Sequence, residues 1–156
     1  MRIYSYIDKH KKRDKYSDLM LKLKNSVDEK FYYESIFIIY AILEDRTESL
    51  LKHAHIIILK NDNQKLSLSE KLDKIRNCDQ FKDEYIKKHL TSEMINQIYE
   101  WKNKRNLLMH NLINLEYCNS EIEELALDGY ELIKQLNNKS TLVNKYNDNI
   151  KKAINL

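Results

Sequence analysis

The chain has 156 residues, which is enough for one domain with a substantial core and too few for two comfortable ones. It contains no proline and a single glycine, and β-sandwiches and barrels need both residues for their many tight turns, so the composition excludes such folds and predicts an all-helical one. The net charge of +3 is mild, so charge alone does not indicate a nucleic-acid-binding protein.

The cysteines and the apolar segments of the sequence indicate where in the cell the protein is expected. Cys78 and Cys118 form neither a CxxC pair nor a zinc-ligand spacing, so we expect no zinc site and no disulfide framework. The first eight residues lack the apolar stretch of a signal peptide. The most apolar run, from Ile36 to Leu43, is far shorter than the ~20 residues needed to cross a bilayer. We therefore expect a cytoplasmic protein that does not enter a membrane.

Helical periodicity divides the first half of the chain into two helices. Apolar residues recur at helical spacing from about residue 8 to 24 and predict an N-terminal helix. The role of residues 1–25 is not evident from the sequence. Ser26 and Glu29 have the spacing of a capping box, which would open a long helix running from about Val27 to Leu59. The polar segment from Asn61 to Lys65 ends this helical pattern.

The pattern of the second half predicts five shorter helices. Ser67 and Glu70 form another capping box, predicting a helix to about Asn77, followed by a short piece over about 81–90. Thr91 or Ser92 would cap the next helix. Asn119 begins a further helix, and a last polar helix spans about 141–154. The whole chain, residues 1–156, thus predicts one compact bundle of about five to seven helices.

One segment, from Trp101 to Leu112, carries residues suited to chemistry. Arg105 interrupts an apolar stripe, and since a buried unpaired guanidinium is costly, the helix must meet a cleft, a partner or a carboxylate there. Arginine suits a phosphate and histidine moves protons near neutrality, so Arg105 and His110 are candidate catalytic residues, with Asn106 beside them. Two flanking lysines are candidate RNA contacts: Lys102 and Lys104.

Helix geometry limits how this pair could work. On a straight helix Arg105 and His110 point about 140° apart and are separated by about 7.5 Å of rise. Either the helix ends or bends between them, or a second copy brings its own pair alongside. A two-fold dimer achieves the latter because it places the same patch of both subunits face to face. The geometry therefore predicts that the active form is a homodimer.

The long second helix contains a charged group in its middle, formed by Glu44, Asp45, Arg46 and Glu48. One interpretation is an exposed turn whose face carries Glu44 and Glu48 together with Lys52. The other is that Asp45 or Arg46, with Glu44 nearby, lies behind the catalytic residues and orients the histidine or adds a phosphate contact.

The segment Arg105-Asn106-Leu107-Leu108-Met109-His110 resembles the R-x4–6-H motif of the HEPN superfamily in its R-N-x-x-x-H form. The resemblance implies a small all-α bundle, a dimer that joins two motifs in one cleft, and metal-independent RNA cleavage. Many such proteins are toxins, abortive-infection proteins or other phage-defence components, so a cognate antitoxin or regulatory protein is an expected partner. Relatives neutralised by tyrosine modification carry H-x-Y, whereas here Leu112 occupies the tyrosine position.

Other interpretations stay open at this stage. Arg46 and His53 also fit the motif, with six residues between them, and His53 with His55 suggests a metal site, although residues two apart on a helix diverge by about 200°. We expect no metal and no cofactor. The chain could instead be a non-catalytic HEPN-type RNA-binding or dimerisation module, or a helical adaptor that binds a protein partner.

Overall fold

The computed structural model describes residues 9–56, 64–112 and 119–154, and within these ranges it contains α-helices, one 3-10 turn and no β-strand. The all-helical bundle expected from the composition is confirmed. The elements are α1 (Lys9–Asp28), α2 (Tyr32–His53), α3 (Leu68–Asn77), η1 (Asp79–Phe81), α4 (Glu84–His89), α5 (Ser92–Asn111) and α6 (Asn119–Ile154).

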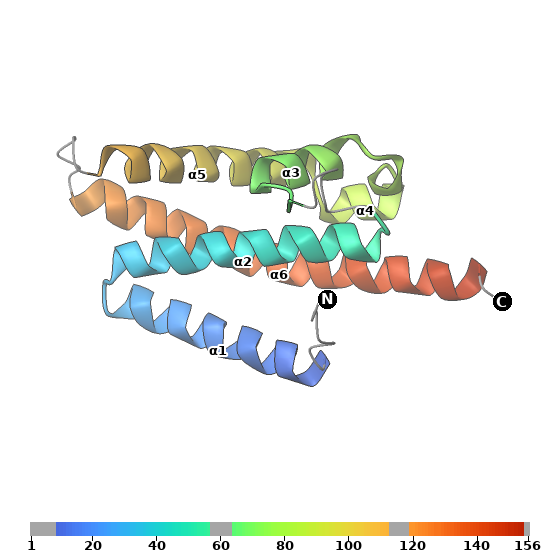
Figure 1. The fold of residues 1–156 in the computed structure, drawn as a ribbon, viewed down its shortest axis with the longest axis horizontal. Helices are drawn as coiled ribbons and strands as arrows, with labels where there is room; N and C mark the ends of the chain where they lie inside the picture. Colours follow the sequence, from blue (N-terminus) through green and yellow to red (C-terminus); the bar gives the residue numbers. More distant parts are fainter. Residues whose placement is uncertain (1–8, 57–63, 113–118, 155–156) are drawn as a thin grey trace.

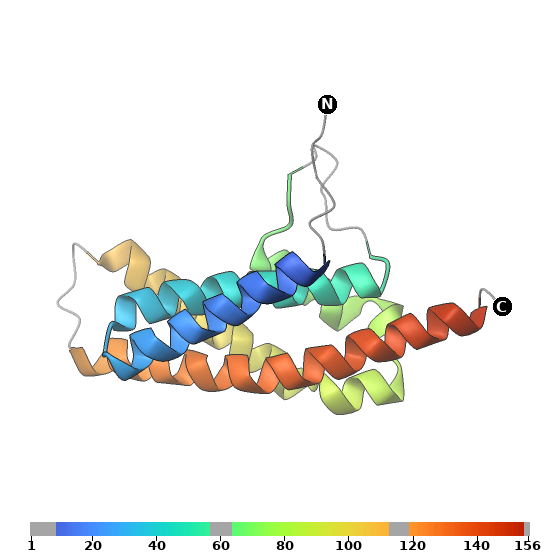
Figure 2. The same ribbon diagram turned by 90° about the horizontal axis from the view of Figure 1, so that it is seen from below.

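Helices α2 and α6 pack against each other along the middle of the bundle (Figures 1 and 2). Helix α1 covers them on one side, and α3, α4 and α5 cover the other (Figure 1). The core follows from α2, whose isoleucines and leucines recur on more than one face and are buried: Ile36, Ile38, Ile39, Ile42, Leu43, Leu50 and Leu51. None of the described helices combines the length and apolarity that a bilayer-crossing segment needs.

Side-chain caps fix the starts of the shorter helices. Ser67 and Glu70 form the predicted capping box of α3, each satisfying a backbone N–H that has no partner within the helix. Thr91 caps α5 by accepting from the N–H of Met94. Both predictions are confirmed, because in each cap the partner atoms lie within three residues and no tertiary contact takes the capping group.

The capping box predicted at Ser26 is wrong. Helix α1 continues through Ser26 to Asp28. The buried Ser26 hydroxyl donates to the carbonyl of Leu23, and it lies 2.9 Å from the Ser35 hydroxyl. The turn is made at Lys30, whose φ of 61° is left-handed, and α2 begins at Tyr32. Helix α2 ends at His53 rather than Leu59, which lies outside the described residues.

Helix α6 is one continuous helix, so the predicted division near residue 141 is also wrong. The polar run before Thr141 resembles a break, but Leu136, Ser140 and Val143 are buried at helical spacing and carry the helix through it. The hydroxyl of Thr141 satisfies the carbonyl of Asn137 within the helix. Hydroxyl groups that could have ended the helix are thus used inside it.

Gly129 lets α5 and α6 approach closely. A Cβ at this position would lie 2.5 Å from Nε1 of Trp101. The indole instead lies against the α6 backbone and donates a 2.8 Å hydrogen bond to the carbonyl of Leu125. The chain's one glycine therefore serves helix packing, which also fixes the orientation of α5.

Candidate functional site

The three motif residues lie on one regular helix. Helix α5 continues without interruption from Ser92 to Asn111, so it includes Arg105, Asn106 and His110. Arg105 and Asn106 are half-buried, whereas His110 is exposed in the last turn. With no bend between them, Arg105 and His110 keep the divergence of about 140° that a straight helix imposes. One chain by itself does not bring them to one point.

The Arg105 guanidinium lies over the face of Tyr40 from α2, with 4.4 Å between Cζ and the ring centroid. Its Nη1 donates to Oδ1 of Asn106 at 3.2 Å. Its Nε is buried and has no hydrogen-bond partner among the described residues. A cation on an aromatic face is held there electrostatically, so the Tyr40 ring fixes the position of the Arg105 guanidinium.

A hydrogen bond within α2 holds the Tyr40 side chain in place. Its hydroxyl donates to Oε1 of Glu44, one turn further along α2, at 3.3 Å. Burial raises the pKa of Tyr40, the Glu44 carboxylate raises it further, and the Arg105 charge opposes both effects. The ring therefore stays neutral as a platform beneath the arginine.

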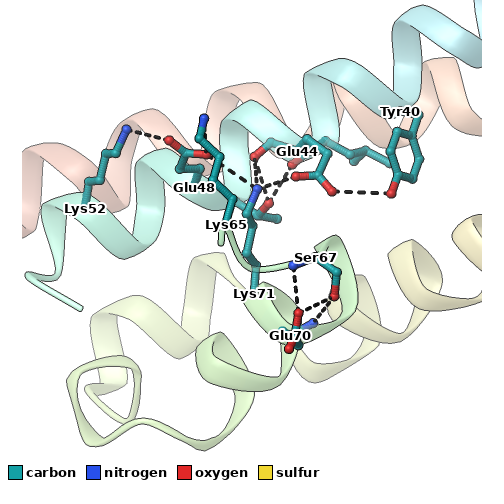
Figure 3. Close-up of polar contacts among 10 residues, drawn as sticks. Tyr40, Glu44, Glu48, Lys52, Lys65, Ser67, Glu70 and Lys71 are labelled. Atoms are coloured by element: carbon teal, nitrogen blue, oxygen red, sulfur yellow. Dashed lines mark hydrogen bonds and ion pairs between the residues drawn. The ribbon is translucent and has the colours of Figure 1, made fainter. Parts of the chain in front are cut away.

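Glu44 also connects this platform to α3 (Figure 3). Its second carboxylate oxygen accepts from Nζ of Lys71, which is 2 % exposed, and Lys71 lies 3.5 Å from Glu48. Glu48 in turn binds Lys52 at 2.5 Å and lies 3.9 Å from Lys65. Although burial raises the pKa of Glu48, these lysines more than offset it and hold that pKa below its usual range.

The charged face of α2 is thus more than the exposed helix face that was one interpretation of the sequence. The Glu48–Lys52 pair of that interpretation is present. However, α3 covers the face with Lys71, which interleaves between two carboxylates instead of leaving them to solvent. Lys71 is a residue that sequence reasoning missed, and the signal was its position within the apolar spacing of Leu68, Leu72 and Ile75.

Among the three residues proposed to lie behind the motif, the structure links Glu44 to Arg105 through Tyr40. Arg46 points about 200° away from Glu44 around the helix. Its guanidinium lies 4.0 Å from the ring centroid of Tyr16 on α1, and it binds Asp45 at 2.6 Å. Arg46 therefore stabilises the contact between α1 and α2 and does not reach the motif.

The two flanking lysines differ in their surroundings. Lys102 donates to the hydroxyl of Ser69 at 2.6 Å and lies 5.5 Å from the ring of Tyr99, so it ties α5 to α3. Lys104 is exposed and lines two adjoining hollows of about 280 Å³ and 250 Å³ between α5 and α6. Asp128 lines both hollows as well. We call these hollows together the α5–α6 groove.

The α5–α6 groove is acidic. Among the residues that the structure describes, its charged lining consists of one lysine and five carboxylates: Lys104, Glu100, Glu121, Glu124, Asp128 and Glu131. Its apolar lining consists of Trp101, Leu107, Leu108, Leu125 and Leu132. The carboxylates of this lining would repel RNA phosphates, which disfavours the RNA contact expected of Lys104.

Exposed apolar side chains lie beside the Tyr40–Arg105 contact. Helices α2 and α5 run in opposite directions (Figure 1), so residues before Tyr40 and residues after Arg105 extend toward the same end of the bundle. Phe37, one turn before Tyr40, is 66 % exposed, and Leu112, two turns after Arg105, is 46 % exposed. The exposed side chains of Phe37 and Leu112 leave an apolar surface toward this end of the bundle.

The competing sites have structural roles. His53 of the second motif match binds Asp148 of α6 through Nδ1 at 2.7 Å, while Arg46 lies on Tyr16. No group of three His, Cys, Asp or Glu side chains in the described ranges is arranged to hold a metal ion. Cys78 is a free thiol, and Cys118 lies outside the described residues. Comparison of the chain with protein-family models, with curated proteins and with solved structures found no match.

Proposed function

We propose that this protein is a metal-independent endoribonuclease of the HEPN type, active as a homodimer and serving as a toxin or phage-defence effector. The observation that carries the proposal is the position of Arg105, whose guanidinium lies over the Tyr40 ring, on the same helix as the exposed His110. A cation that is already held in position can stabilise charge that develops on a phosphoryl group.

The reaction we propose is internal transesterification. The ribose 2′-hydroxyl loses its proton and attacks the adjacent phosphorus, forming a 2′,3′-cyclic phosphate, while the departing 5′-oxygen gains a proton and leaves as a hydroxyl. His110 of one subunit removes or supplies a proton, which contributes typically ~10²–10⁴-fold to a rate. Arg105 stabilises the phosphoryl oxygens, and Asn106 keeps the guanidinium oriented through their hydrogen bond.

The dimer follows from the straightness of α5. Because Arg105 and His110 diverge on one helix, the reacting phosphate needs Arg105 from one subunit and His110 from its partner. The exposed side chains of Phe37 and Leu112 beside the motif offer the apolar contact that such an isologous interface requires. A two-fold axis there would also supply two histidines, one as base and one as acid.

Incubation of purified protein with total RNA and a labelled oligonucleotide in EDTA tests the proposal. Wild type should cleave and leave cyclic-phosphate ends, and Arg105→Ala and His110→Ala should not. Two matched controls, Arg76→Ala in α3 and His89→Ala in α4, remove the same residue types elsewhere and should cleave as wild type does. Cleavage by Arg105→Ala or His110→Ala at the wild-type rate would contradict the assignment.

A non-catalytic RNA-binding or dimerisation module is the second candidate. The observation that favours it is that Arg105 already has structural partners in Tyr40 and Asn106. Such a module predicts that wild type binds the oligonucleotide without cleaving it and that His110→Ala binds equally well.

A further inference from the structure

We propose that the α5–α6 groove is the docking site for a basic amphipathic helix of a partner protein. The groove lies on a different face of α5 from the Arg105 side chain, because Arg105 is directed at Tyr40 of α2 while the groove residues adjoin α6. The proposal is therefore independent of the ribonuclease assignment.

The shape of the groove suits a helix. The lining residues of α5 are Gln97, Glu100, Trp101, Lys104, Leu107 and Leu108, and those of α6 are Glu121, Glu124, Leu125, Asp128, Glu131, Leu132 and Gln135. Both sets recur at steps of three and four residues, so each forms a straight stripe along one face of its helix. The α6 stripe spans about 21 Å, which corresponds to about four turns of a docked helix.

The charge of the groove defines the chemistry of its occupant. Glu124 and Asp128 are exposed like charges one turn apart on α6, and Glu100 of α5 lines the same hollow as Asp128. Lys104 is the one cation in the lining that the described residues form, and Glu131 is also bound by Lys134 at 2.6 Å. Carboxylates arranged along both edges of a groove repel one another, and lysines or arginines on the edges of a docked helix would relieve that repulsion.

The edge of the groove supplies its main apolar contact, because Trp101 and Leu125 on the floor are only 3 % and 6 % exposed. Leu107 is 58 % exposed at its edge, and Trp101 and Leu125 form the floor beneath the carboxylates. An apolar floor between charged edges fits the recognition mode in which an amphipathic helix lays its apolar face into a groove. A nucleic acid, whose charge has the wrong sign, is not accommodated there.

Trp101 gives a direct probe, because it is the only tryptophan in the chain and it lines the groove. We would follow its single indole N–H resonance while adding an acetylated peptide with leucines at i, i+3, i+4 and i+7 and lysines elsewhere, about 14 residues long to match the stripe. A second peptide has glutamate in place of every lysine. The lysine peptide should shift the resonance saturably at one-to-one stoichiometry, and the glutamate peptide should not.

Matched variants separate docking from general charge attraction. The triple variant Glu124→Gln, Asp128→Asn and Glu131→Gln should weaken binding of the lysine peptide at least about tenfold, as losing several charge pairs does. The control Glu34→Gln, Glu84→Gln and Glu93→Gln removes the same charge outside the groove and should stay within about twofold. Leu107→Ser should weaken binding with the groove charges intact. Equal weakening by the two triple variants, equal binding of both peptides, or no shift of the indole resonance would overturn the proposal.

Discussion

The guanidinium of Arg105 lies 4.4 Å from the ring centroid of Tyr40, which joins α5 to α2 at the centre of the candidate site. Tyr40 in turn binds Glu44, and Glu44 binds the buried Lys71 of α3. Three helices therefore determine where one arginine lies. Because of these contacts, the packing of the three helices also fixes the position of the Arg105 guanidinium.

Replacing Tyr40 tests whether the ring positions Arg105. Tyr40→Leu removes the aromatic face and should lower RNA cleavage about 5–30-fold, which corresponds to the ~1–2 kcal/mol of a partly buried cation–π contact. Tyr40→Phe keeps the face and loses only the bond to Glu44, so it should stay within about threefold of wild type. Single-turnover cleavage rates check this, and equal rates for the two variants would show that the ring is dispensable.

Phe37 tests the dimer. Phe37→Glu places a charge on the exposed apolar surface beside the motif and should yield monomers that do not cleave RNA. Leu21→Glu is the matched control, because Leu21 is 58 % exposed but lies on α1. Sedimentation velocity gives the oligomeric state, and a fully active monomeric Phe37→Glu protein would exclude the composite site.

Lys71 tests the buried charge network. Lys71→Met leaves Glu44 and Glu48 facing each other without their shared cation and should lower the free energy of unfolding by about 3 kcal/mol. Lys65→Met removes a lysine that is 56 % exposed and 3.9 Å from Glu48, so its effect should be under about 1 kcal/mol. Urea denaturation measures both. Similar small losses would mean that water replaces Lys71.

Gly129 tests the close approach of α5 and α6. In an open helix interior Gly→Ala stabilises by up to about 1 kcal/mol, but here the new Cβ would meet the Trp101 indole. Gly129→Ala should instead destabilise by about 1–3 kcal/mol and shift the Trp101 emission. Thermal unfolding followed by tryptophan fluorescence gives both quantities, and a rise in Tm would contradict the packing described.

The raised pKa of Tyr99 predicts how the free energy of unfolding falls at alkaline pH. Burial, together with the hydrogen bond to Asp73, raises its pKa to about 12, whereas an unfolded tyrosine titrates near pH ~10. Because the folded-state pKa is the higher one, the contribution of Tyr99 is complete below pH ~10 and is lost as the pH rises through about 12. Tyr99→Phe should therefore lose less stability than wild type between pH ~10 and ~12 in urea denaturation. Tyr33→Phe, at an exposed position, should follow wild type.

Local signals were reliable where the chain itself supplies the partner. The caps at Ser67 and Thr91 depend on atoms three residues away, and both form as predicted. Ser26 has the same local spacing but forms no cap, because its hydroxyl binds Ser35 of the next helix. A helix start read from spacing alone fails when a tertiary contact takes the capping group.

The sequence by itself determined the all-helical class, through the lack of turn-forming residues, and the presence of Arg105, Asn106 and His110 in one segment of α5. Only the tertiary structure decided which neighbours these residues have. Tyr40 and Lys71 are 65 and 34 residues away from Arg105 along the chain, and the packing of α2, α3 and α5 brings them together. Helical periodicity specifies which face of a helix a residue occupies, but which helix covers that face depends on how the whole core packs.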